Sequence, residues 1–331
     1  MKTGLVIGKF YPPHRGHKFL VETALDAVDH LDILICVCTD QIISGDLRQK
    51  WLQEIHPGAH VIQIDDFGED DNSMAWAEYT RSILGRAPDI VFTSEDYGET
   101  YARYLGCKHV LVDRDRREVP ISATEIRSNP SEYWEFLEPC VRAYFARRIC
   151  IVGAESTGTT TLARDLAEHY RTVWVPEYGR TYCEALATSG VDLWNYQWQS
   201  AEFLHIAYTQ CELEEKLARE ANRILICDTD ALATGIWHER YMKTRSLEVE
   251  SIAAARKYDL YVLTDCDIPF VQDGLRDGEA IRRWMTVRFE ERLIERQLPW
   301  IKVSGPPEKR LTFAVESIDR LLLCNPFKRG E

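Results

Sequence analysis

The sequence predicts an α/β protein built from two doubly wound parallel-sheet domains in series. Short apolar runs alternate with amphipathic helical stretches along all 331 residues, which is the pattern of parallel sheets covered by helices. The runs are continuously apolar, as expected for strands that are buried on both faces. The chain is longer than a typical single domain and a new strand begins at 147–148, so we place the domains at residues 1–146 and 147–331.

Ten apolar runs are the expected strands, five in each domain. Those of the first domain lie at 4–8, 32–39, 60–64, 89–93 and 108–112. Those of the second domain lie at 148–153, 172–175, 223–228, 259–264 and 300–303. Helical patterns such as 14–28 and 197–221 lie between them. Ligands of such sheets bind at the carboxyl ends of the strands, so functional residues are expected in the strand-to-helix loops.

Composition narrows the function. The formal charge is −13, and the halves before and after the boundary are both acidic, at −9 and −4. This argues against sequence-blind binding to nucleic acid or anionic lipid, which needs a basic surface. No apolar run approaches a membrane span and no signal-peptide layout is present, so we expect no membrane insertion. The ten cysteines include no C-x-x-C pair, which favours reduced thiols and a cytoplasmic location.

The first functional candidate is the segment GKFYPPHRGH, which follows the first strand and opens a helix. His14 and His17 are three residues apart and therefore share one face of the first helical turn. That turn also carries unpaired backbone N–H groups and the positive end of the helix dipole, which suit phosphate. Gly16 leaves space for a flat ligand to approach. The competing interpretation is two exposed histidines without a function.

This segment resembles the H-x-G-H signature of the nucleotidyltransferase superfamily. Residues 121–127, ISATEIR, match that superfamily's second signature, I-S-x-T-x-I-R, at every position, although alone they would also suit a capped surface helix. The resemblance implies a Rossmann-like adenylyltransferase using ATP and Mg²⁺. It implies that His14 and His17 contact the triphosphate, that Lys9 adds charge and that Arg127 holds the leaving pyrophosphate. The ATP site would further include Gly8, Phe10, Gly16, Ser122 and Thr124.

Within the superfamily, GKFYPPHRGH looks like the nicotinamide mononucleotide adenylyltransferases. The stretch DNSMAW at 71–76 is similar to a segment that holds the nicotinamide in that family, which implies roles for Asn72 and Trp76. A cationic pyridinium stacks favourably on an indole face, whereas the alternative is that Trp76 packs in the core. The segment TSEDYG at 93–98 lies at the end of an expected strand, where that family contacts its nucleotide. A different phosphomonoester acceptor, such as phosphopantetheine, is the alternative substrate.

The second domain contains an altered phosphate-binding loop. The sequence GAESTGTT at 153–160 follows a strand, precedes a helix and has the spacing G-x-x-x-x-G-K-[ST], except that Thr159 replaces the lysine. Backbone N–H groups of such a loop hold phosphates, and Thr160 would place its hydroxyl on Mg²⁺. An ordinary Gly-rich turn is the competing interpretation. The expected ATP-binding residues are Gly153, Glu155, Ser156, Thr157, Gly158, Thr159, Thr160 and Thr161.

The whole second domain resembles the ribosylnicotinamide kinase half of the bifunctional NadR-like family. The resemblance implies that Asp228, at a strand end, helps to hold Mg²⁺ as in other P-loop kinases. The implied riboside-binding residues are Glu177, Tyr178, Arg180 and Asp230. The segment 273–283 looks like a lid, or alternatively like a solvated basic helix start, and its candidate phosphate ligands are Arg276, Arg282 and Arg283.

The leading hypothesis is therefore a bifunctional enzyme of NAD salvage that phosphorylates nicotinamide riboside and adenylylates nicotinamide mononucleotide. Three outcomes are open for Thr159: a working kinase in which another cation replaces the lysine, a slow kinase, or a domain that only binds nucleotide and acts as a sensor. Some relatives carry an additional N-terminal DNA-binding domain, which we do not expect here because Met1 lies just before the first strand. The sequence leaves the oligomeric state open, a homo-oligomer included.

Overall fold

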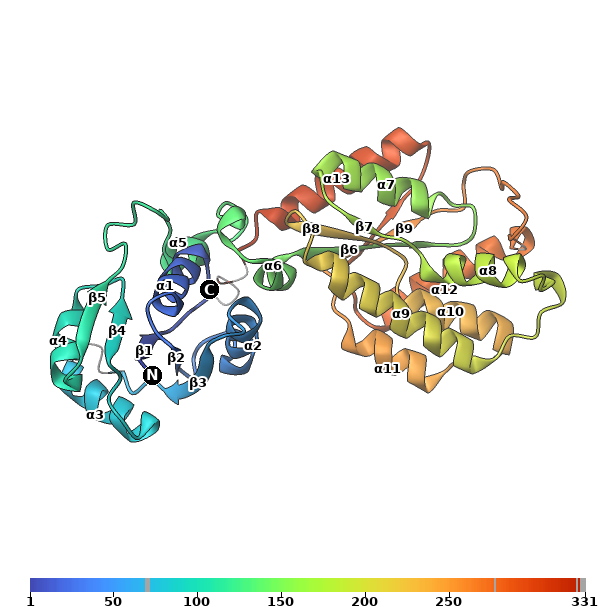
Figure 1. Cartoon of the computed structure of the whole chain (residues 1–331). Helices are drawn as coiled ribbons and strands as arrows, with labels where there is room; N and C mark the ends of the chain where they lie inside the picture. The colour runs from blue at the N-terminus through green and yellow to red at the C-terminus, as the bar shows by residue number, and fades with distance from the viewer. Residues whose placement is uncertain (69–71, 277, 326, 328–331) are drawn as a thin grey trace. The chain divides into compact units, whose positions relative to one another are not determined.

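The computed structural model of the chain describes residues 1–68, 72–276, 278–325 and 327, and it divides into two compact units (Figure 1). The first unit contains Met1–Val141 together with Asn325 and Phe327, and the second contains Arg142–Cys324. The division thus falls five residues before the predicted boundary, inside the short helix α6 (Pro139–Phe145).

The first unit is a five-stranded parallel sheet with the order β3-β2-β1-β4-β5. Its strands are β1 Thr3–Gly8, β2 His30–Val37, β3 His60–Asp65, β4 Ile90–Thr93 and β5 Lys108–Leu111. Its helices are α1 Arg15–Leu25, α2 Gly45–Ile55, α3 Ser73–Leu84, α4 Tyr97–Leu105 and α5 Ala123–Ser128, followed by the 3₁₀ turn η1 Trp134–Phe136. One buried cluster joins the sheet to α1 and α2, and a second joins it to α3 and α4.

The second unit is also a five-stranded parallel sheet, with the order β10-β9-β6-β8-β7. Its strands are β6 Arg147–Gly153, β7 Trp174–Val175, β8 Ile224–Asp228, β9 Leu260–Thr264 and β10 Trp300–Val303. Its helices are α7 Thr159–Tyr170, α8 Tyr178–Thr188, α9 Ser200–Ala218, α10 Ala231–Met242, α11 Leu247–Ala255, α12 Arg282–Glu295 and α13 Pro307–Leu322, with 3₁₀ turns η2 Leu193–Asn195 and η3 Glu279–Ile281. Helices α7 and α13 cover one face, and α9, α10 and α11 lie on the other (Figure 1).

Both sheets confirm the predicted fold class. The central strands β1 and β6 are apolar and buried because helices cover both faces of each sheet. In each unit the first strand of the sheet runs into a glycine and then a helix, which brings the two predicted phosphate-binding loops to the carboxyl edges of their sheets.

All ten cysteines are free thiols. Among the helices that the structure describes, none combines the length and the apolar character that crossing a bilayer requires.

Candidate active sites

The turn between β1 and α1 holds the two signature histidines against each other. His14 is the N-cap of α1, and its Nδ1 accepts a hydrogen bond from the backbone N–H of Gly16 at 3.1 Å. An accepting Nδ1 places the ring proton on Nε2, which is then free to act as a donor. The His14 and His17 rings stack with their centroids 3.7 Å apart. A Cβ at position 16 would lie 3.0 Å from the His14 ring, so the motif's glycine lets the imidazole fold back over the turn.

Burial makes both imidazoles weak bases. It lowers the pKa of His17 to about 3, assisted by the positive charge of Arg116. It lowers the pKa of His14 well below its usual value, with further contributions from His17, Arg116 and Arg127. Both rings are therefore neutral at neutral pH, and each offers one N–H donor to a phosphate oxygen without contributing a full charge. Within the described residues the buried Nδ1 of His17 has no hydrogen-bond partner.

Arg127 joins the second signature to the first loop. Its Nη1 donates to the carbonyl oxygen of Tyr11 at 2.7 Å, its Nη2 donates to the hydroxyl of Thr124 at 3.0 Å, and its guanidinium lies 5.4 Å from the centroid of the Tyr11 ring. The helix that carries it, α5, begins with a capping box in which Ser122 and Glu125 bond each other's backbone N–H groups. The structure thus brings His14, His17 and Arg127 to the same edge of the first sheet.

A buried arginine, which the sequence analysis did not single out, holds the backbone of the loop between β1 and α1. Arg48, fully buried on α2, donates to the carbonyl oxygens of Lys9 and Cys36 and to the side chain of Gln41. Lys9 itself, just past Gly8, pairs with Asp66 at 3.2 Å and keeps its side chain 46% exposed. Arg48 thus holds the carbonyl of Lys9, while the ammonium of Lys9 contacts Asp66 and remains accessible to solvent.

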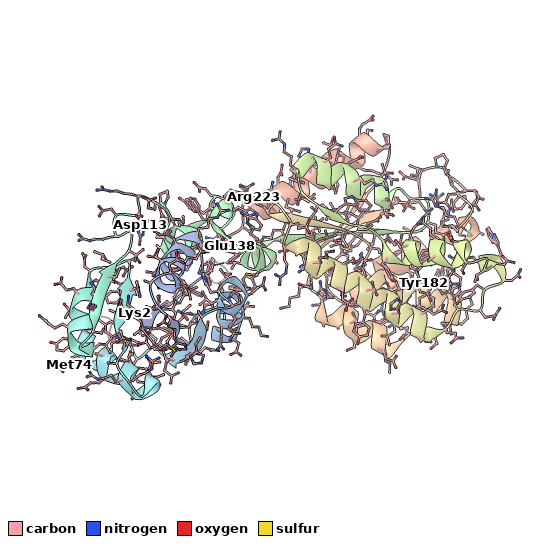
Figure 2. The ribbon with its side chains drawn as sticks, viewed as in Figure 1. Lys2, Met74, Asp113, Glu138, Tyr182 and Arg223 are labelled. Atoms are coloured by element: carbon pink, nitrogen blue, oxygen red, sulfur yellow. The ribbon has the colours of Figure 1, made fainter. Side chains whose placement is uncertain are left out.

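A second missed residue is Arg116, on the loop between β5 and α5 whose first turn is marked by Asp113 in Figure 2. The Asp113 carboxylate accepts hydrogen bonds from the backbone N–H groups of Arg117, Glu118 and Val119. Arg116 is exposed, and its charge acts on both signature histidines. The segment RDRR at 114–117 was the available signal, but only the folded loop shows which of its arginines lowers the pKa of the histidines.

The proposed nicotinamide residues lie around α3. Asn72 caps that helix, its side-chain oxygen accepting from the backbone N–H of Ala75 at 3.0 Å. Trp76 is only 8% exposed and stacks on Phe67 with ring centroids 4.1 Å apart. The indole therefore takes part in the core, and Phe67, which is 42% exposed, is the aromatic face that solvent reaches. Asp71, the first residue of the predicted segment, lies outside the described residues.

The segment 93–98 is fixed by side-chain hydrogen bonds. The buried Thr93 hydroxyl bonds the carbonyl of Glu95 at 3.1 Å and the Nε2 of His109 at 2.8 Å. A Cβ on Gly98 would lie 2.1 Å from that same hydroxyl, so glycine is required for α4 to approach β4. Tyr97, with its ring 40% exposed, donates to the carbonyl of Ile7 at 3.4 Å.

The second unit's loop has phosphate-loop geometry. Ser156 and Gly158 adopt positive φ values of 58° and 82°, and α7 begins at Thr159. The buried Thr157 hydroxyl bonds the carbonyl of Ala154 at 2.6 Å and the hydroxyl of Thr264 at 2.7 Å, which closes the loop onto β9. The Thr160 hydroxyl donates to Asp228 Oδ2 at 2.6 Å. Thr161 points outward and is exposed.

A pocket opens beside this loop at the carboxyl edge of the second sheet. Its predicted members are Gly153, Glu155, Ser156, Thr159, Thr160, Glu177, Arg180, Asp228 and Arg276. Burial, with the nearby Asp228 charge, raises the pKa of Glu177, and burial also raises the pKa of Asp228. Two carboxyls share a poorly solvated site, so each proton is held more tightly than in water. Buried Oδ1 of Asp228 has no hydrogen-bond partner among the described residues.

Aromatic side chains that sequence reasoning missed form the other wall of this pocket. They are Trp194, Trp198, Phe203, Trp237 and Tyr241. The Trp198 and Tyr241 ring centroids lie 5.4 Å apart, and those of Trp237 and Tyr241 lie 6.2 Å apart. They come from η2, α10 and the segment around the start of α9, so no single sequence motif announces them.

Several predicted residues do not line the pocket. Asp230 is fully buried, caps α10 by accepting from Ala233 N–H at 3.0 Å, and accepts from the Tyr261 hydroxyl at 2.7 Å. Tyr178 turns to His205, which it meets at 3.2 Å. In the candidate lid, Arg282 is buried and donates to the carbonyls of Ser156 and Ile268, whereas Arg283 is exposed. Asp277, in the same segment, lies outside the described residues.

Known proteins are similar to this chain over one or both of its units. A family model described as an AAA domain matches residues 148–310. The trifunctional NAD biosynthesis/regulator protein NadR of Escherichia coli is 30% identical over 315 residues, covering 88% of this chain and 75% of that protein. The nicotinamide-nucleotide adenylyltransferase of Thermococcus onnurineus is 27% identical over 190 residues, which are 54% of this chain and 99% of that enzyme.

Solved structures share the architecture. The crystal structure of a NadR protein in complex with NR superposes with a TM-score of 0.80 at 20% identity, covering 98% of this chain and 96% of that one. A NadR protein in complex with NAD and AMP-PNP superposes with a TM-score of 0.75. At this level of identity the likeness establishes the shared fold.

The pKa shifts of the stacked histidines can be tested directly. Because burial disfavours the charged rings, we expect His14 and His17 to stay neutral from pH 8 down to pH 5, with His14 protonated on Nε2. Nitrogen-15 NMR of histidine-labelled protein, assigned with His14→Gln and His17→Gln variants, measures both charge and tautomer. A ring of this pair that titrates near pH 6.5 would contradict the assignment.

Proposed function

The chain belongs to the NadR family of NAD-biosynthesis proteins, and from this premise we propose that each unit catalyses one step from nicotinamide riboside to NAD. The second unit would phosphorylate the riboside, and the first would adenylylate the resulting nicotinamide mononucleotide. The stacked His14–His17 pair, joined to Arg127 through the Tyr11 loop, is the observation that carries the proposal. The ten free thiols support a cytoplasmic location for the protein.

In the first unit, the acceptor needs no general base because a phosphomonoester is already an anionic nucleophile. An oxygen of the mononucleotide phosphate attacks the α-phosphorus of ATP, and the bond to the bridging oxygen of pyrophosphate breaks. The neutral N–H donors of His14 and His17 hold phosphate oxygens, while Arg127 and Arg116 neutralise the charge that grows on the leaving pyrophosphate. Lys9 adds a cation at the mouth of the loop.

The nicotinamide ring of the acceptor would pack against the aromatic cluster of Phe67, Trp76 and Tyr79. A cationic pyridinium is attracted to the face of an aromatic ring, and Phe67 is the exposed member of the cluster. Asn72, the N-cap of the helix that carries Trp76 and Tyr79, would supply polar groups to the nicotinamide. This arrangement favours nicotinamide mononucleotide over acceptors that lack a cationic ring.

In the second unit, the riboside would place its pyridinium among the aromatic rings and its hydroxyl near Glu177. Glu177 accepts the hydroxyl proton as that oxygen attacks the γ-phosphorus of ATP, and ADP leaves. Asp230, already engaged by Ala233 and Tyr261, has no part in this step.

The donor set at the strand end fits magnesium. The Thr160 hydroxyl and the Asp228 carboxylate lie together, and Asp228 retains a buried oxygen that is not hydrogen-bonded within the described residues. Hard oxygen ligands of this kind, with ATP phosphates and water, suit Mg²⁺. When bound there with ATP, magnesium would neutralise part of the phosphate charge, and Thr160 and Asp228 would hold it.

Arg276 is the best replacement for the missing lysine of the phosphate loop. It lines the same pocket as Glu177, and its positive charge lowers the pKa of that carboxyl, so it supplies a cation to this site. The Asp273 carboxylate orients the Arg276 side chain, because its Oδ2 lies 3.1 Å from Arg276 Nε. The same oxygen lies 2.6 Å from Arg180 Nη1. Arg276 also donates to the carbonyl of Val271 at 2.7 Å, and Arg282, which donates to two backbone carbonyls, does not line the pocket.

Removing one signature histidine separates the two activities. In His17→Ala, NAD formation from nicotinamide mononucleotide and ATP should fall at least about a hundredfold, because a donor to the transition-state phosphate is lost. Riboside phosphorylation should persist, since His17 belongs to the other unit. Glu22→Ala, an exposed substitution on the same helix, is the matched control. The assignment of activities to units fails if His17→Ala loses both activities together.

The role of Arg276 is tested by removing one cation and restoring another. Arg276→Ala should lower phosphorylation of nicotinamide riboside on the order of a hundredfold, and Thr159→Lys in that background should restore much of it. Thr161→Lys, an exposed position two residues further along the same helix, should not restore it. Unchanged phosphorylation in Arg276→Ala contradicts the replacement. Tight ATP binding by the unaltered chain without any phosphate transfer would instead support a nucleotide sensor, the alternative that Thr159 favours.

A further inference from the structure

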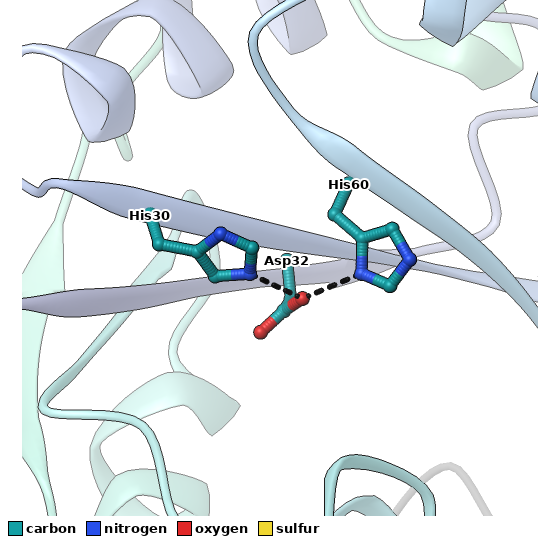
Figure 3. A group of neighbouring side chains, drawn as sticks. All are labelled: His30, Asp32 and His60. Atoms are coloured by element: carbon teal, nitrogen blue, oxygen red, sulfur yellow. Dashed lines mark hydrogen bonds and ion pairs between the residues drawn. The ribbon is translucent and has the colours of Figure 1, made fainter.

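Two histidines and an aspartate gather at the amino end of the first sheet. His30 and Asp32 lie two residues apart on β2, and side chains at that spacing project from the same face of a strand. Asp32 pairs in register with His60, the first residue of β3, which adds a third side chain to the same face. The parallel pairing of β2 and β3 therefore builds the group shown in Figure 3.

The three side chains point at one another. His30 Nε2 lies 3.0 Å from Asp32 Oδ1, and His60 Nδ1 lies 2.9 Å from the same oxygen (Figure 3). The three atoms that can bind a metal all lie within 4.8 Å of one another. Among the described residues, no other group of three or more His, Cys, Asp or Glu side chains brings its ligand atoms this close together.

The carboxylate is oriented by a third partner. Asp32 is buried at 2% exposure, and its other oxygen, Oδ2, accepts a hydrogen bond from Arg86 Nη2 at 2.9 Å. Arg86 thus turns Oδ1 toward the imidazoles, which is the kind of outer contact that fixes metal ligands. The His30 and His60 side chains are 36% and 60% exposed, so solvent reaches the group from outside and both rings have room to turn.

We propose that His30, Asp32 and His60 form a zinc site, with water as the fourth ligand. Two imidazole nitrogens and one carboxylate oxygen are donors that zinc takes in sites open to solvent, whereas magnesium and calcium prefer oxygen alone. Ligand atoms around a tetrahedral zinc stand roughly 3.3 Å apart, given metal–ligand bonds of about 2.0–2.1 Å. The present contacts of 2.9 and 3.0 Å need to open only slightly, and rotation of the exposed rings brings the two nitrogens together.

The site would act on structure rather than on the reaction. It lies where β2 and β3 begin, whereas the phosphate-binding loop follows the carboxyl end of β1 in the same parallel sheet. A bound metal would link the edge strand β3 to its neighbour β2, adding to the backbone hydrogen bonds between them. The adenylylation step should therefore proceed at the same rate with or without this metal.

Zinc titration of the full-length protein tests the proposal. After chelator treatment and dialysis, calorimetric titration of the wild type with zinc chloride should show a site with micromolar or tighter affinity. His60→Ala should weaken that site at least about tenfold. His169→Ala, which removes an exposed histidine in the second unit, is the matched control and should bind as the wild type does. NAD formation should be unchanged in His60→Ala.

A second measurement guards against misfolding. Circular dichroism of His60→Ala checks the fold, and His30→Gln removes a different ligand of the same site. Cobalt(II) bound to the wild type should give the visible absorption of a tetrahedral ion, and both variants should lose it. The proposal is overturned if the wild type binds no zinc, or if both variants bind it as tightly as the wild type does. In either case, direct N–H···O hydrogen bonds alone account for the group.

Discussion

A hydrogen bond from Arg127 to the carbonyl of Tyr11 connects segments that are 116 residues apart in the sequence. The proposed adenylylation site depends on it, because it brings the guanidinium of the last residue of the second motif to the loop that carries the two histidines. Arg48 holds the same loop by a second contact, because it donates to the carbonyl oxygens of Lys9 and Cys36. Charge and geometry are thus set before any nucleotide arrives, which is the condition for electrostatic catalysis of phosphate chemistry.

In the second unit, too, protein contacts hold the polar groups of the site in place, but the residues are different. The loop after β6 offers backbone N–H donors. The Thr160 hydroxyl and the Asp228 carboxylate lie within hydrogen-bond distance of each other, and aromatic side chains from neighbouring helices line the rest of the pocket. Burial raises the pKa of both Glu177 and Asp228, so this site strongly favours a nearby cation. The loop itself lacks the lysine, and Arg276 supplies a cation from a separate segment. In the proposed kinase, Arg276 would thus restore the positive charge that the loop lacks without its lysine.

Local patterns predicted the two parallel sheets and the strand–loop–helix segments at their carboxyl edges, whereas phosphate binding by the residues of those loops stays a prediction. They could not decide whether Asp230 and Trp76 line a pocket or lie in the core. That outcome depends on which residues surround them in the folded chain. Tyr261 and Phe67, which engage these two side chains, are not marked by any local motif. Likewise, the group of His30, Asp32 and His60 requires the register between two strands, which the sequence does not state.

The central claim is that one chain carries out two consecutive reactions of NAD synthesis. Purified protein supplied with nicotinamide riboside, ATP and Mg²⁺, and followed by mass spectrometry, tests it most directly. The account predicts that nicotinamide mononucleotide forms first and that NAD then accumulates with release of pyrophosphate. Failure to form NAD even when nicotinamide mononucleotide is supplied directly would contradict it.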